Sequence, residues 1–136
     1  NVRLVRADAR DFLRQRVGSE SVQAIHIYFP DPWWKKRHWK RRLFSGDFPA
    51  QCERVLRPGG RLLVVTDVEE YHRLIQGLLA ECPLLRPMPP PEPGQPQHDL
   101  DYLTNFERKF RKEGRPIYRL AYERRTAETG RKALGS

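Results

Sequence analysis

Residues 22–29 have the sequence Val-Gln-Ala-Ile-His-Ile-Tyr-Phe, a run of β-branched and aromatic residues that stops at Pro30. This composition predicts a β-strand, because such side chains favour the pleated surface of a sheet. Residues 61–66, Arg-Leu-Leu-Val-Val-Thr, form a second run that is almost entirely apolar. A nearly continuous apolar strand is typical of burial on both faces of a parallel sheet.

Helical patterns alternate with these strands. We expect helices over residues 8–16, 43–56 and 69–81. Pro49 should mark the first turn of the second helix, because proline fits where a helix begins. The third helix carries apolar residues along one face, namely Tyr71, Leu74, Ile75, Leu78 and Leu79.

Two further strands, over residues 2–5 and 117–123, and a turn at 57–60 complete the pattern. Strands and helices that alternate at this spacing predict an α/β domain with a mostly parallel sheet. Residues 87–96 hold six prolines, so we expect an extended surface loop there. We assign residues 1–125 to one domain portion and residues 126–136 to a polar tail that frays.

The composition is that of a polar globular domain. Of 136 residues, 38% are hydrophobic and 32% are charged, which suits a single core. No apolar run approaches the roughly 20 residues of a membrane-spanning helix, so we expect a protein that neither spans a membrane nor has one as its partner. Cys52 and Cys82 are too few for a disulfide framework or a metal cluster, so we expect a cytoplasmic protein without metal. Because the chain opens at Asn1 directly into a predicted strand, we expect a piece of a longer protein.

Positive charge is the strongest global signal. Lys and Arg number 26 against 17 acidic residues, which gives a formal net charge of +9. The charge is concentrated between Lys35 and Arg42, where only Trp39 interrupts a run of Lys, Arg and His. Such clustering favours binding of a polyanion over a merely solubilising surface, and RNA, DNA and acidic membranes all fit it.

Acidic residues follow three of the predicted strands. Asp8 follows the first, Asp31 lies between Pro30 and Pro32 after the second, and Asp67 follows the third. They are candidate site residues, because binding and catalytic sites in open parallel sheets lie at the carboxyl ends of the strands. Asp also favours the N-cap of a helix, and for Asp8 this alternative is equally good. It suits Asp31 less, since the flanking prolines hold that residue in a rigid turn.

Residues 29–43, Phe-Pro-Asp-Pro-Trp-Trp-Lys-Lys-Arg-His-Trp-Lys-Arg-Arg-Leu, closely resemble the signature of the bacterial-type tRNA (guanine-N7)-methyltransferases. Residues 104–108, Thr-Asn-Phe-Glu-Arg, followed by Gly114 and then by Tyr-Glu-Arg at 122–124, resemble the C-terminal signature of the same family. The resemblance extends from Asn1 to about Arg125. It implies a Rossmann-like class I methyltransferase fold and transfer of a methyl group from S-adenosylmethionine to N7 of a guanine in the tRNA variable loop.

The resemblance also implies roles for individual residues. Asp31 matches the catalytic residue, and Asp8 matches the acidic residue at the adenine end of the cofactor. Positions that bind the substrate are matched by Lys35, Asp67, Thr104, Asn105, Phe106 and Glu107. Since the basic run follows the catalytic turn directly, we expect phosphate contacts beside the modified guanine from Lys36, Arg37, Lys40, Arg41 and Arg42.

The chemistry accounts for a carboxylate at Asp31. Guanine N7 carries an in-plane lone pair and no proton, so displacement on the sulfonium methyl needs no general base. Positive charge leaves the sulfur and develops on the purine. A fixed carboxylate that accepts hydrogen bonds from the guanine N1 and N2 hydrogens would stabilise that charge and align the nucleophile. Glu107 or Asp67 is the second acceptor that we expect, and Trp33 or Trp34 either stacks on an unpaired base or packs in the core.

Two features of the family, the Gly-rich cofactor loop and the acid on the cofactor ribose, have no counterpart in these residues. We therefore expect a fold that is incomplete at the N-terminus, and a fragment that alone is inactive, binds the cofactor poorly, and self-associates through the edge of strand 22–29 or pairs with a separate N-terminal part. Two alternatives stay open. One is a methyltransferase acting on an exocyclic amine, against which Phe29-Pro30 and the basic run argue. The other is an inert RNA-binding module, which a cofactor-binding measurement would distinguish.

Overall fold

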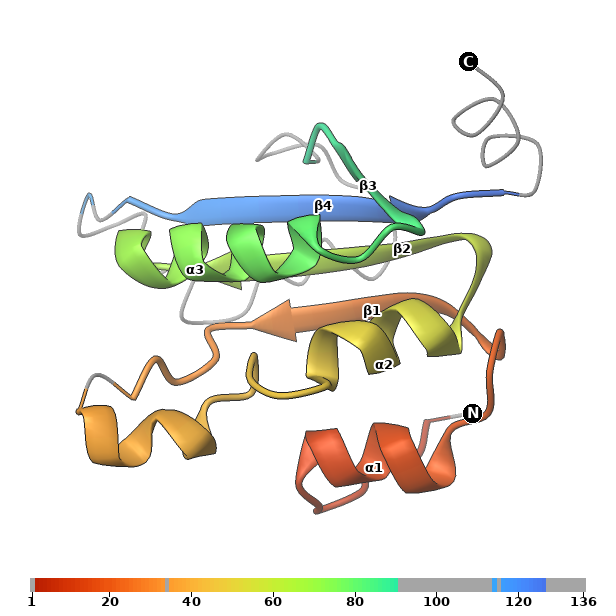
Figure 1. Ribbon diagram of the computed structural model, residues 1–136, viewed down its shortest axis with the longest axis horizontal. Helices are drawn as coiled ribbons and strands as arrows, with labels where there is room; N and C mark the ends of the chain where they lie inside the picture. The colour runs from red at the N-terminus through yellow and green to blue at the C-terminus, as the bar shows by residue number, and fades with distance from the viewer. Residues whose placement is uncertain (1, 34, 91–113, 115, 127–136) are drawn as a thin grey trace.

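The computed structural model describes residues 2–33, 35–90, 114 and 116–126 of the chain. Three α-helices, one 3-10 helix and four strands lie within these ranges (Figure 1). In chain order they are α1 (Ala9–Arg16), β1 (Val22–Tyr28), η1 (Lys36–Arg41), α2 (Phe48–Val55), β2 (Leu56–Thr66), α3 (Glu69–Ala80), β3 (Leu85–Met88) and β4 (Tyr118–Arg124). In the described part of the chain, none of the helices has the length and apolar character that crossing a membrane requires.

The four strands form one sheet in the order β1-β2-β4-β3. β1 and β2 pair in parallel, while β4 pairs antiparallel with both β2 and β3. Strands β1, β2 and β3 therefore share one direction, and among the described strands β4 alone runs against them. The α/β prediction is confirmed, although of the three ladders between described strands only β1–β2 is parallel. That pair requires a crossover connection, which η1 and α2 supply.

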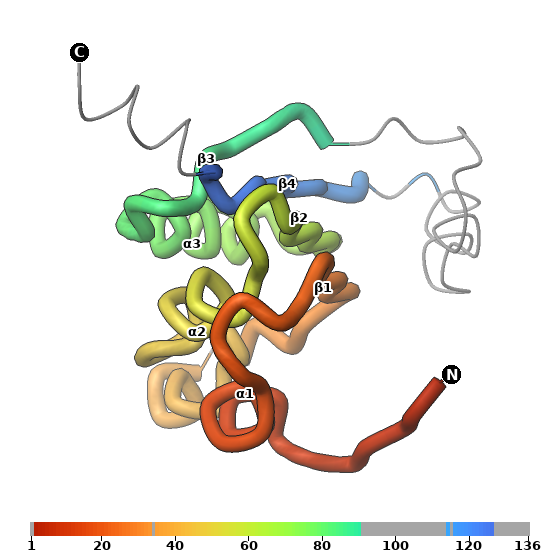
Figure 2. Tube along the Cα trace, turned by 90° about the vertical axis from the view of Figure 1, so that its right-hand side faces the viewer, coloured from red at the N-terminus to blue at the C-terminus, as the bar shows by residue number. Residues whose placement is uncertain are grey.

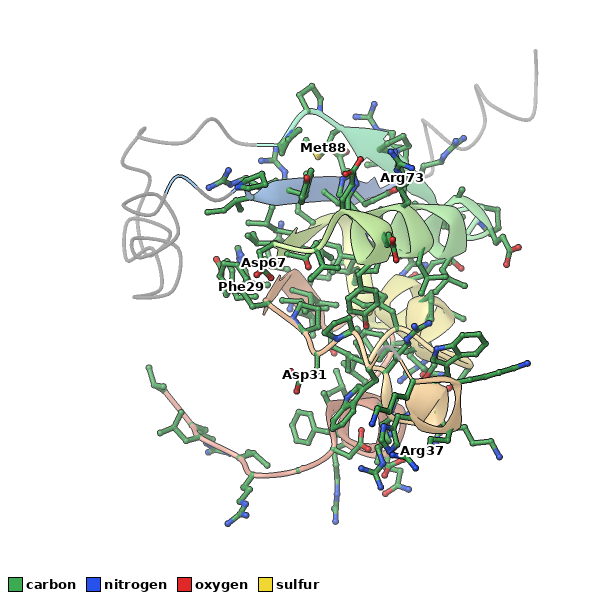
Figure 3. The ribbon with its side chains drawn as sticks, turned by 90° about the vertical axis from the view of Figure 1, so that its left-hand side faces the viewer. Phe29, Asp31, Arg37, Asp67, Arg73 and Met88 are labelled. Carbon is green, nitrogen blue, oxygen red and sulfur yellow. The ribbon has the colours of Figure 1, made fainter. Side chains whose placement is uncertain are left out.

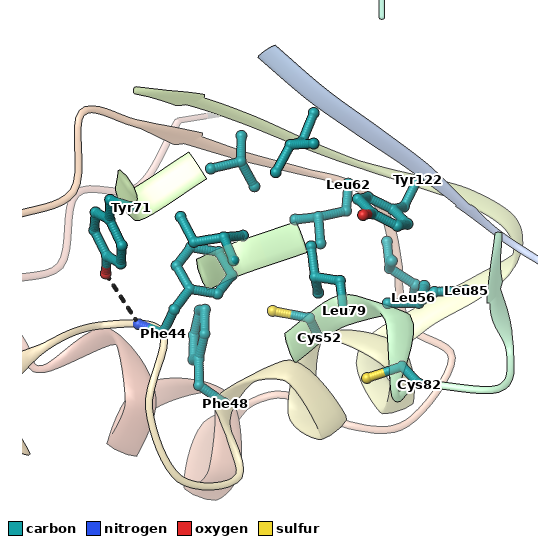
Figure 4. Packing of buried hydrophobic residues seen from close by; sticks show 13 residues of the cluster. Phe44, Phe48, Cys52, Leu56, Leu62, Tyr71, Leu79, Cys82, Leu85 and Tyr122 are labelled. Atoms are coloured by element: carbon teal, nitrogen blue, oxygen red, sulfur yellow. Dashed lines mark hydrogen bonds between the residues drawn. The ribbon is translucent and has the colours of Figure 1, made fainter. Parts of the chain in front are cut away.

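Helices α2 and α3 cover one face of the sheet, and α1 packs against α2 (Figure 2). Each covering helix buries residues spaced three or four apart, which places them on one helix face. Figure 4 shows the resulting core, whose members include Phe44, Phe48, Cys52, Leu56, Leu62, Tyr71, Leu79, Cys82, Leu85 and Tyr122.

Residues 62–66 of β2 are buried, as the apolar run predicted. Leu62 and Val64 belong to the core beneath the helices, whereas Leu63 and Val65 belong to a smaller cluster on the opposite face. Successive side chains of a strand point to opposite faces, so an apolar run with no polar alternation fills both sides of the sheet. This strand forms the centre on which the site is built.

The turn predicted at 57–60 lies inside β2. Between the pairs Val22↔Leu56 and Ala24↔Arg61, β1 advances by two residues and β2 by five, so β2 bulges at this point. Gly59 has φ +83°, and a Cβ at Gly60 would come within 2.8 Å of the Arg57 carbonyl oxygen. Glycine is required at both positions, and the predicted turn is an irregularity within the strand.

The prediction of a strand at residues 2–5 is wrong. These residues form no ladder with any described strand, and Val2 and Leu4 are 88% and 96% exposed. Branched side chains favour a strand only where a neighbouring strand completes the backbone hydrogen bonds. Composition alone does not supply that neighbour.

Two predicted elements begin about five residues from their observed starts, and η1 and β3 were not predicted. β2 starts at Leu56 and not at Arg61, and the other difference is at residues 43–47. There the helix expected from Leu43 begins only at α2, with Pro49 in its first turn as predicted. Gly46 precedes it with φ +55°, a left-handed conformation that a helix excludes. In the proline-rich stretch, Pro87 belongs to β3, and residues 91–96, like the tail at 127–136, lie outside the described residues.

Candidate active site

The carboxyl ends of β1 and β2 lie together, because Tyr28 pairs with Val65 at the end of the parallel ladder. Asp31 follows β1 and Asp67 directly follows β2. Figure 3 looks onto this end of the sheet, with Asp67 beside Phe29 and the exposed Asp31 side chain pointing outward. The structure therefore brings two of the predicted site carboxylates to the same end of the sheet.

The turn that carries Asp31 has an unusual backbone at both of its ends. Phe29 has φ +51° and Trp33 has φ +47°. This left-handed region costs a non-glycine residue on the order of 1–3 kcal/mol, and such residues cluster at functional sites. At the first end, the backbone N–H of Phe29 donates to the Val65 carbonyl at 2.7 Å. The turn is thus tied to the end of β2.

Tyr71 of α3 lies behind this turn and is 1% exposed. Burial raises the pKa of its phenol, and the charge of Asp31 raises that pKa further, whereas a hydrogen bond from Phe44 and the charge of Arg42 lower it. The backbone N–H of Phe44 donates to the Tyr71 hydroxyl at 3.4 Å (Figure 4). The sequence identified Tyr71 only as a core residue. In the structure its buried ring also lies 6.0 Å from the Arg42 guanidinium, which donates to the Asp31 turn.

Asp8 caps α1. Its Oδ1 accepts a hydrogen bond from the backbone N–H of Arg10 at 2.9 Å, and its Oδ2 accepts one from the Arg10 guanidinium at 2.8 Å. The guanidinium is the main reason that the pKa of Asp8 falls from 3.8 to about 2. The N-cap alternative for Asp8 is therefore what the structure shows, while its place beside the cofactor stays a prediction.

Arg10 connects α1 to the basic segment, a role that the sequence did not reveal. Besides its two contacts with Asp8, its guanidinium donates to the Lys40 carbonyl at 2.5 Å and to the Ser45 hydroxyl at 3.3 Å. These partners lie 30 and 35 residues away in sequence. The only local signal was a basic residue two positions after a capping aspartate.

The basic segment, residues 35–42, contains η1. Its basic side chains contact the rings of Trp33 and Trp39. Lys36 Nζ lies 5.9 Å from the Trp39 ring centre, and the Arg41 guanidinium lies 5.5 Å from that of Trp33. His38 meets Trp33 edge-on at 5.5 Å. Trp39 is 43% exposed and Trp33 is half-buried. Cation–π contacts of this kind order long basic side chains at a surface. Exposed basic residues at this surface are Lys35, Lys36, Arg37, Lys40 and Arg41.

Arg42 departs from the other residues that were predicted to contact phosphates. It is half-buried, and its Nε donates to the Pro32 carbonyl at 2.5 Å. The guanidinium also lies 5.0 Å from the Trp39 ring centre and 6.0 Å from that of Tyr71. It is directed toward the Asp31 turn, whereas Arg37 projects from η1 at the surface (Figure 3).

The remaining predicted site residues, Thr104, Asn105, Phe106 and Glu107, lie outside the described residues, as does Trp34. Among the residues that are described, no three His, Cys, Asp or Glu side chains are arranged to hold a metal ion. Cys52 and Cys82 are free and buried, and burial raises their thiol pKa values to about 12 and about 11. Neither thiol is a nucleophile at neutral pH.

Comparison with known proteins identifies the family. The family model described as "Putative methyltransferase" matches residues 1–120. The chain belongs to this methyltransferase family. The resemblance expected from its motifs is thereby confirmed.

Curated relatives of this methyltransferase-family chain are named tRNA (guanine-N(7)-)-methyltransferase. One from Rhodopirellula baltica is 47% identical over 113 residues, covering 82% of this chain and 42% of the relative. A relative from Ralstonia nicotianae is 41% identical, and the match covers 93% of this chain and 50% of the relative. A relative from Treponema pallidum is also 41% identical, and the match covers 90% of this chain and 47% of the relative. The chain thus spans about half the length of the curated relatives it matches.

A solved structure supports the fold. The crystal structure titled "Putative DNA Modification Methylase", from Thermus thermophilus, aligns with a TM-score of 0.53 at 20% sequence identity. The alignment covers 89% of this chain and 52% of that one. This likeness agrees with the Rossmann-like prediction.

Proposed function

We propose that residues 1–125 form part of a cytoplasmic enzyme that methylates N7 of a guanine in the tRNA variable loop. The observation that carries the proposal is the Asp31 turn. It lies at the carboxyl end of β1, its backbone is strained at Phe29 and Trp33, and it leads directly into the exposed basic helix η1. In a methyltransferase-family chain, this combination supports a catalytic carboxylate beside an RNA-binding surface.

Asp31 supplies the electrostatic part of the proposed reaction. The donor, S-adenosylmethionine, supplies a methyl group activated on a positively charged sulfur. The Asp31 carboxylate accepts hydrogen bonds from the guanine N1 and N2 hydrogens, and it stabilises the positive charge that develops on the purine. Asp67, which follows β2 at the same end of the sheet, or Glu107 would be a second acceptor. Carboxylates at this end also suit a cofactor that carries a sulfonium and an amino group.

Asp8 would contact the adenine end of the cofactor. Its carboxylate is exposed and is held in one orientation by Arg10. Because Arg10 also binds the backbone of η1, the residue proposed for the cofactor and the segment proposed for RNA are joined through one guanidinium. This arrangement supports a site in which the two substrates approach each other from adjacent elements.

The exposed cations of η1 would bind phosphates on either side of the modified guanine. Lys36 and Arg41 are ordered on tryptophan rings, and a 3-10 helix with three residues per turn places Arg37 and Lys40 on one side. Lys35 and the residues at 104–107 would contact the guanine nucleotide itself. Phosphate contacts position the RNA without reading its sequence.

The test is the Asp31→Asn variant of the intact protein, compared with Asp11→Asn. Asp11 is an exposed carboxylate of α1 whose described ion pair is with Arg14, so it is a matched control for the loss of one charge. We expect Asp31→Asn to slow single-turnover methyl transfer about 100-fold or more, with cofactor affinity within about twofold, and Asp11→Asn to behave like the wild type.

Near-normal transfer by Asp31→Asn would refute the assignment of the catalytic carboxylate. The position of the methyl group in the product, determined by nucleoside mass spectrometry of digested tRNA, tests the rest. Methyl transfer to an exocyclic amine would contradict the proposed reaction. Tight tRNA binding by an intact protein that neither binds the cofactor nor transfers a methyl group would indicate an inert RNA-binding module.

A further inference from the structure

We propose that Arg42 is a positioning residue that holds the Asp31 turn in its reactive conformation, and that it does not bind tRNA phosphates. The inference rests on the proposed function, since that function gives the turn its role. It separates Arg42 from the other cations of the basic segment, with which the sequence groups it.

The first observation is the direction of the side chain. Arg42 Nε donates to the carbonyl oxygen of Pro32 at 2.5 Å, the residue directly after Asp31. Its neighbours Lys40 and Arg41 are exposed, whereas Arg42 is half-buried. A guanidinium that is committed to a backbone carbonyl behind the turn is poorly placed to reach a phosphate at the surface.

The second observation is that Arg42 is itself held in place by several contacts. Its guanidinium lies 5.0 Å from the ring centre of Trp39 and 6.0 Å from that of Tyr71. Its backbone N–H donates to the Trp39 carbonyl at 3.1 Å, and its carbonyl accepts from the Ser45 hydroxyl at 2.6 Å. The donor that reaches Pro32 is therefore anchored to η1 and to α3.

The third observation is that the turn needs such an anchor. Both Phe29 and Trp33 have positive φ, so the backbone on each side of Asp31 tends to relax. The Phe29 end is fixed by its hydrogen bond to Val65. Neither Pro30 nor Pro32 has an N–H to donate, so the Pro32 carbonyl is the group through which Arg42 fixes the second end. A displacement of ~1 Å at a catalytic group can slow a reaction about 100-fold.

The charge-conserving variant Arg42→Lys separates positioning from phosphate binding. Lysine is a good phosphate ligand, but its ammonium cannot reproduce a planar guanidinium that contacts the Trp39 and Tyr71 rings while its Nε donates to the Pro32 carbonyl. In the intact protein, we expect Arg42→Lys to lower kcat about 10-fold or more, with KM for tRNA within about twofold. The salt dependence of tRNA binding should be unchanged in both Arg42→Lys and Arg42→Ala.

Arg41→Ala is the comparison variant. It removes an exposed cation, so we expect a higher KM for tRNA and a slope of log affinity against log salt that falls by about 0.7–0.9. A second measurement needs neither tRNA nor activity. In Arg42→Lys, exchange of the Phe29 amide hydrogen, which is bonded to the Val65 carbonyl, should be at least threefold faster than in the wild type, while exchange in α3 stays the same.

Two results would overturn the proposal. One is wild-type kcat and wild-type exchange of the Phe29 amide hydrogen in Arg42→Lys. The other is a decrease in salt dependence in Arg42→Ala that equals the decrease in Arg41→Ala. If the wild-type enzyme is active, either result rejects the role of Arg42 and leaves the proposed function intact. A wild-type protein that does not methylate guanine N7 rejects the proposed function. If Arg42→Ala fails to fold, the charge-conserving variant and the exchange measurement still decide.

Discussion

Asp8 combines a helix cap with a proposed contact to the cofactor, and two substitutions separate these roles. Asp8→Ala removes the acceptor for the Arg10 backbone and the partner of its guanidinium. Asp8→Asn keeps a good capping group but loses the charge, since Asn and Asp are similar N-caps. Asp8→Ala should therefore lower the free energy of unfolding more than Asp8→Asn does. If the cofactor binds the carboxylate, both variants should weaken cofactor binding.

The expected size follows from the structure. The lowering of the Asp8 pKa from 3.8 to about 2, at about 1.36 kcal/mol per pKa unit, bounds the stabilisation by the charge at about 2.4 kcal/mol. The Asp8 side chain is 41% exposed and that of Arg10 27%, so solvent screening reduces this to about 1 kcal/mol. Loss of an N-cap costs about the same. Because the pKa shift already includes the hydrogen bond of the cap, we expect a total loss of about 1–1.5 kcal/mol for Asp8→Ala and about 0.5 kcal/mol for Asp8→Asn.

The pH dependence has a definite sign. The pKa of Asp8 is lower in the folded state, so its stabilisation is fully present above about pH 4 and is lost as the pH falls toward 2. Urea unfolding of wild type, Asp8→Ala and Asp11→Ala at pH 7 and at pH 2.5 measures this. The gap between wild type and Asp8→Ala should be narrower at pH 2.5, and Asp11→Ala should stay within about 0.5 kcal/mol of wild type at pH 7.

Equal unfolding free energies for wild type and Asp8→Ala at pH 7 would refute the capping argument. Calorimetric titration of the intact Asp8→Asn protein with S-adenosylmethionine decides the other role. A fall in affinity of about 10-fold or more, without a matching loss of stability, supports the contact with the cofactor. Unchanged affinity leaves Asp8 as a helix cap alone.

Two further predictions concern the basic surface and the contact between α1 and α2. Replacing Lys36, Lys40 and Arg41 together with alanine should weaken tRNA binding and lower the slope of log affinity against log salt by about 0.7–0.9 for each phosphate that is no longer neutralised; weaker binding with an unchanged slope would show that these side chains do not bind phosphates. Arg54 donates to two backbone carbonyls at the end of α1, each at 2.9 Å. Arg54→Met should therefore lower the free energy of unfolding, measured by urea titration, by about 2 kcal/mol. The control Arg57→Met, which changes an exposed arginine, should change that free energy by less than about 0.5 kcal/mol.

The elements that the sequence predicted well are those that local patterns determine. β1 and α3 have strong composition and periodicity of their own, and Pro49 marks the start of α2. The failure at residues 2–5 has the opposite cause, because a strand depends on a neighbour that composition cannot specify. The bulge at Gly59 and Gly60 was visible as a turn, but only the register with β1 shows that the strand continues through it.

The same distinction applies to the site. Asp31 could be proposed as a site residue because two prolines beside one acidic residue are a local signal. Arg10 and Arg42 were not, since their partners lie 30 and 10 residues away. Within a run of consecutive basic residues, nothing in the sequence indicates which one turns inward. Tyr71 fits a helical apolar face as well as a phenylalanine would, and only the structure shows the charges beside its ring.

The two prolines around Asp31 have a thermodynamic consequence for the proposed reaction. Each ring fixes one φ angle near −65° in the unfolded chain as well as in the folded one, so the turn loses less conformational entropy on folding than three ordinary residues would. This saving offsets part of the cost of the left-handed conformations at Phe29 and Trp33. In the proposed reaction, the backbone that carries the Asp31 carboxylate is then ordered before a base arrives, and little of the free energy of binding is consumed in arranging it.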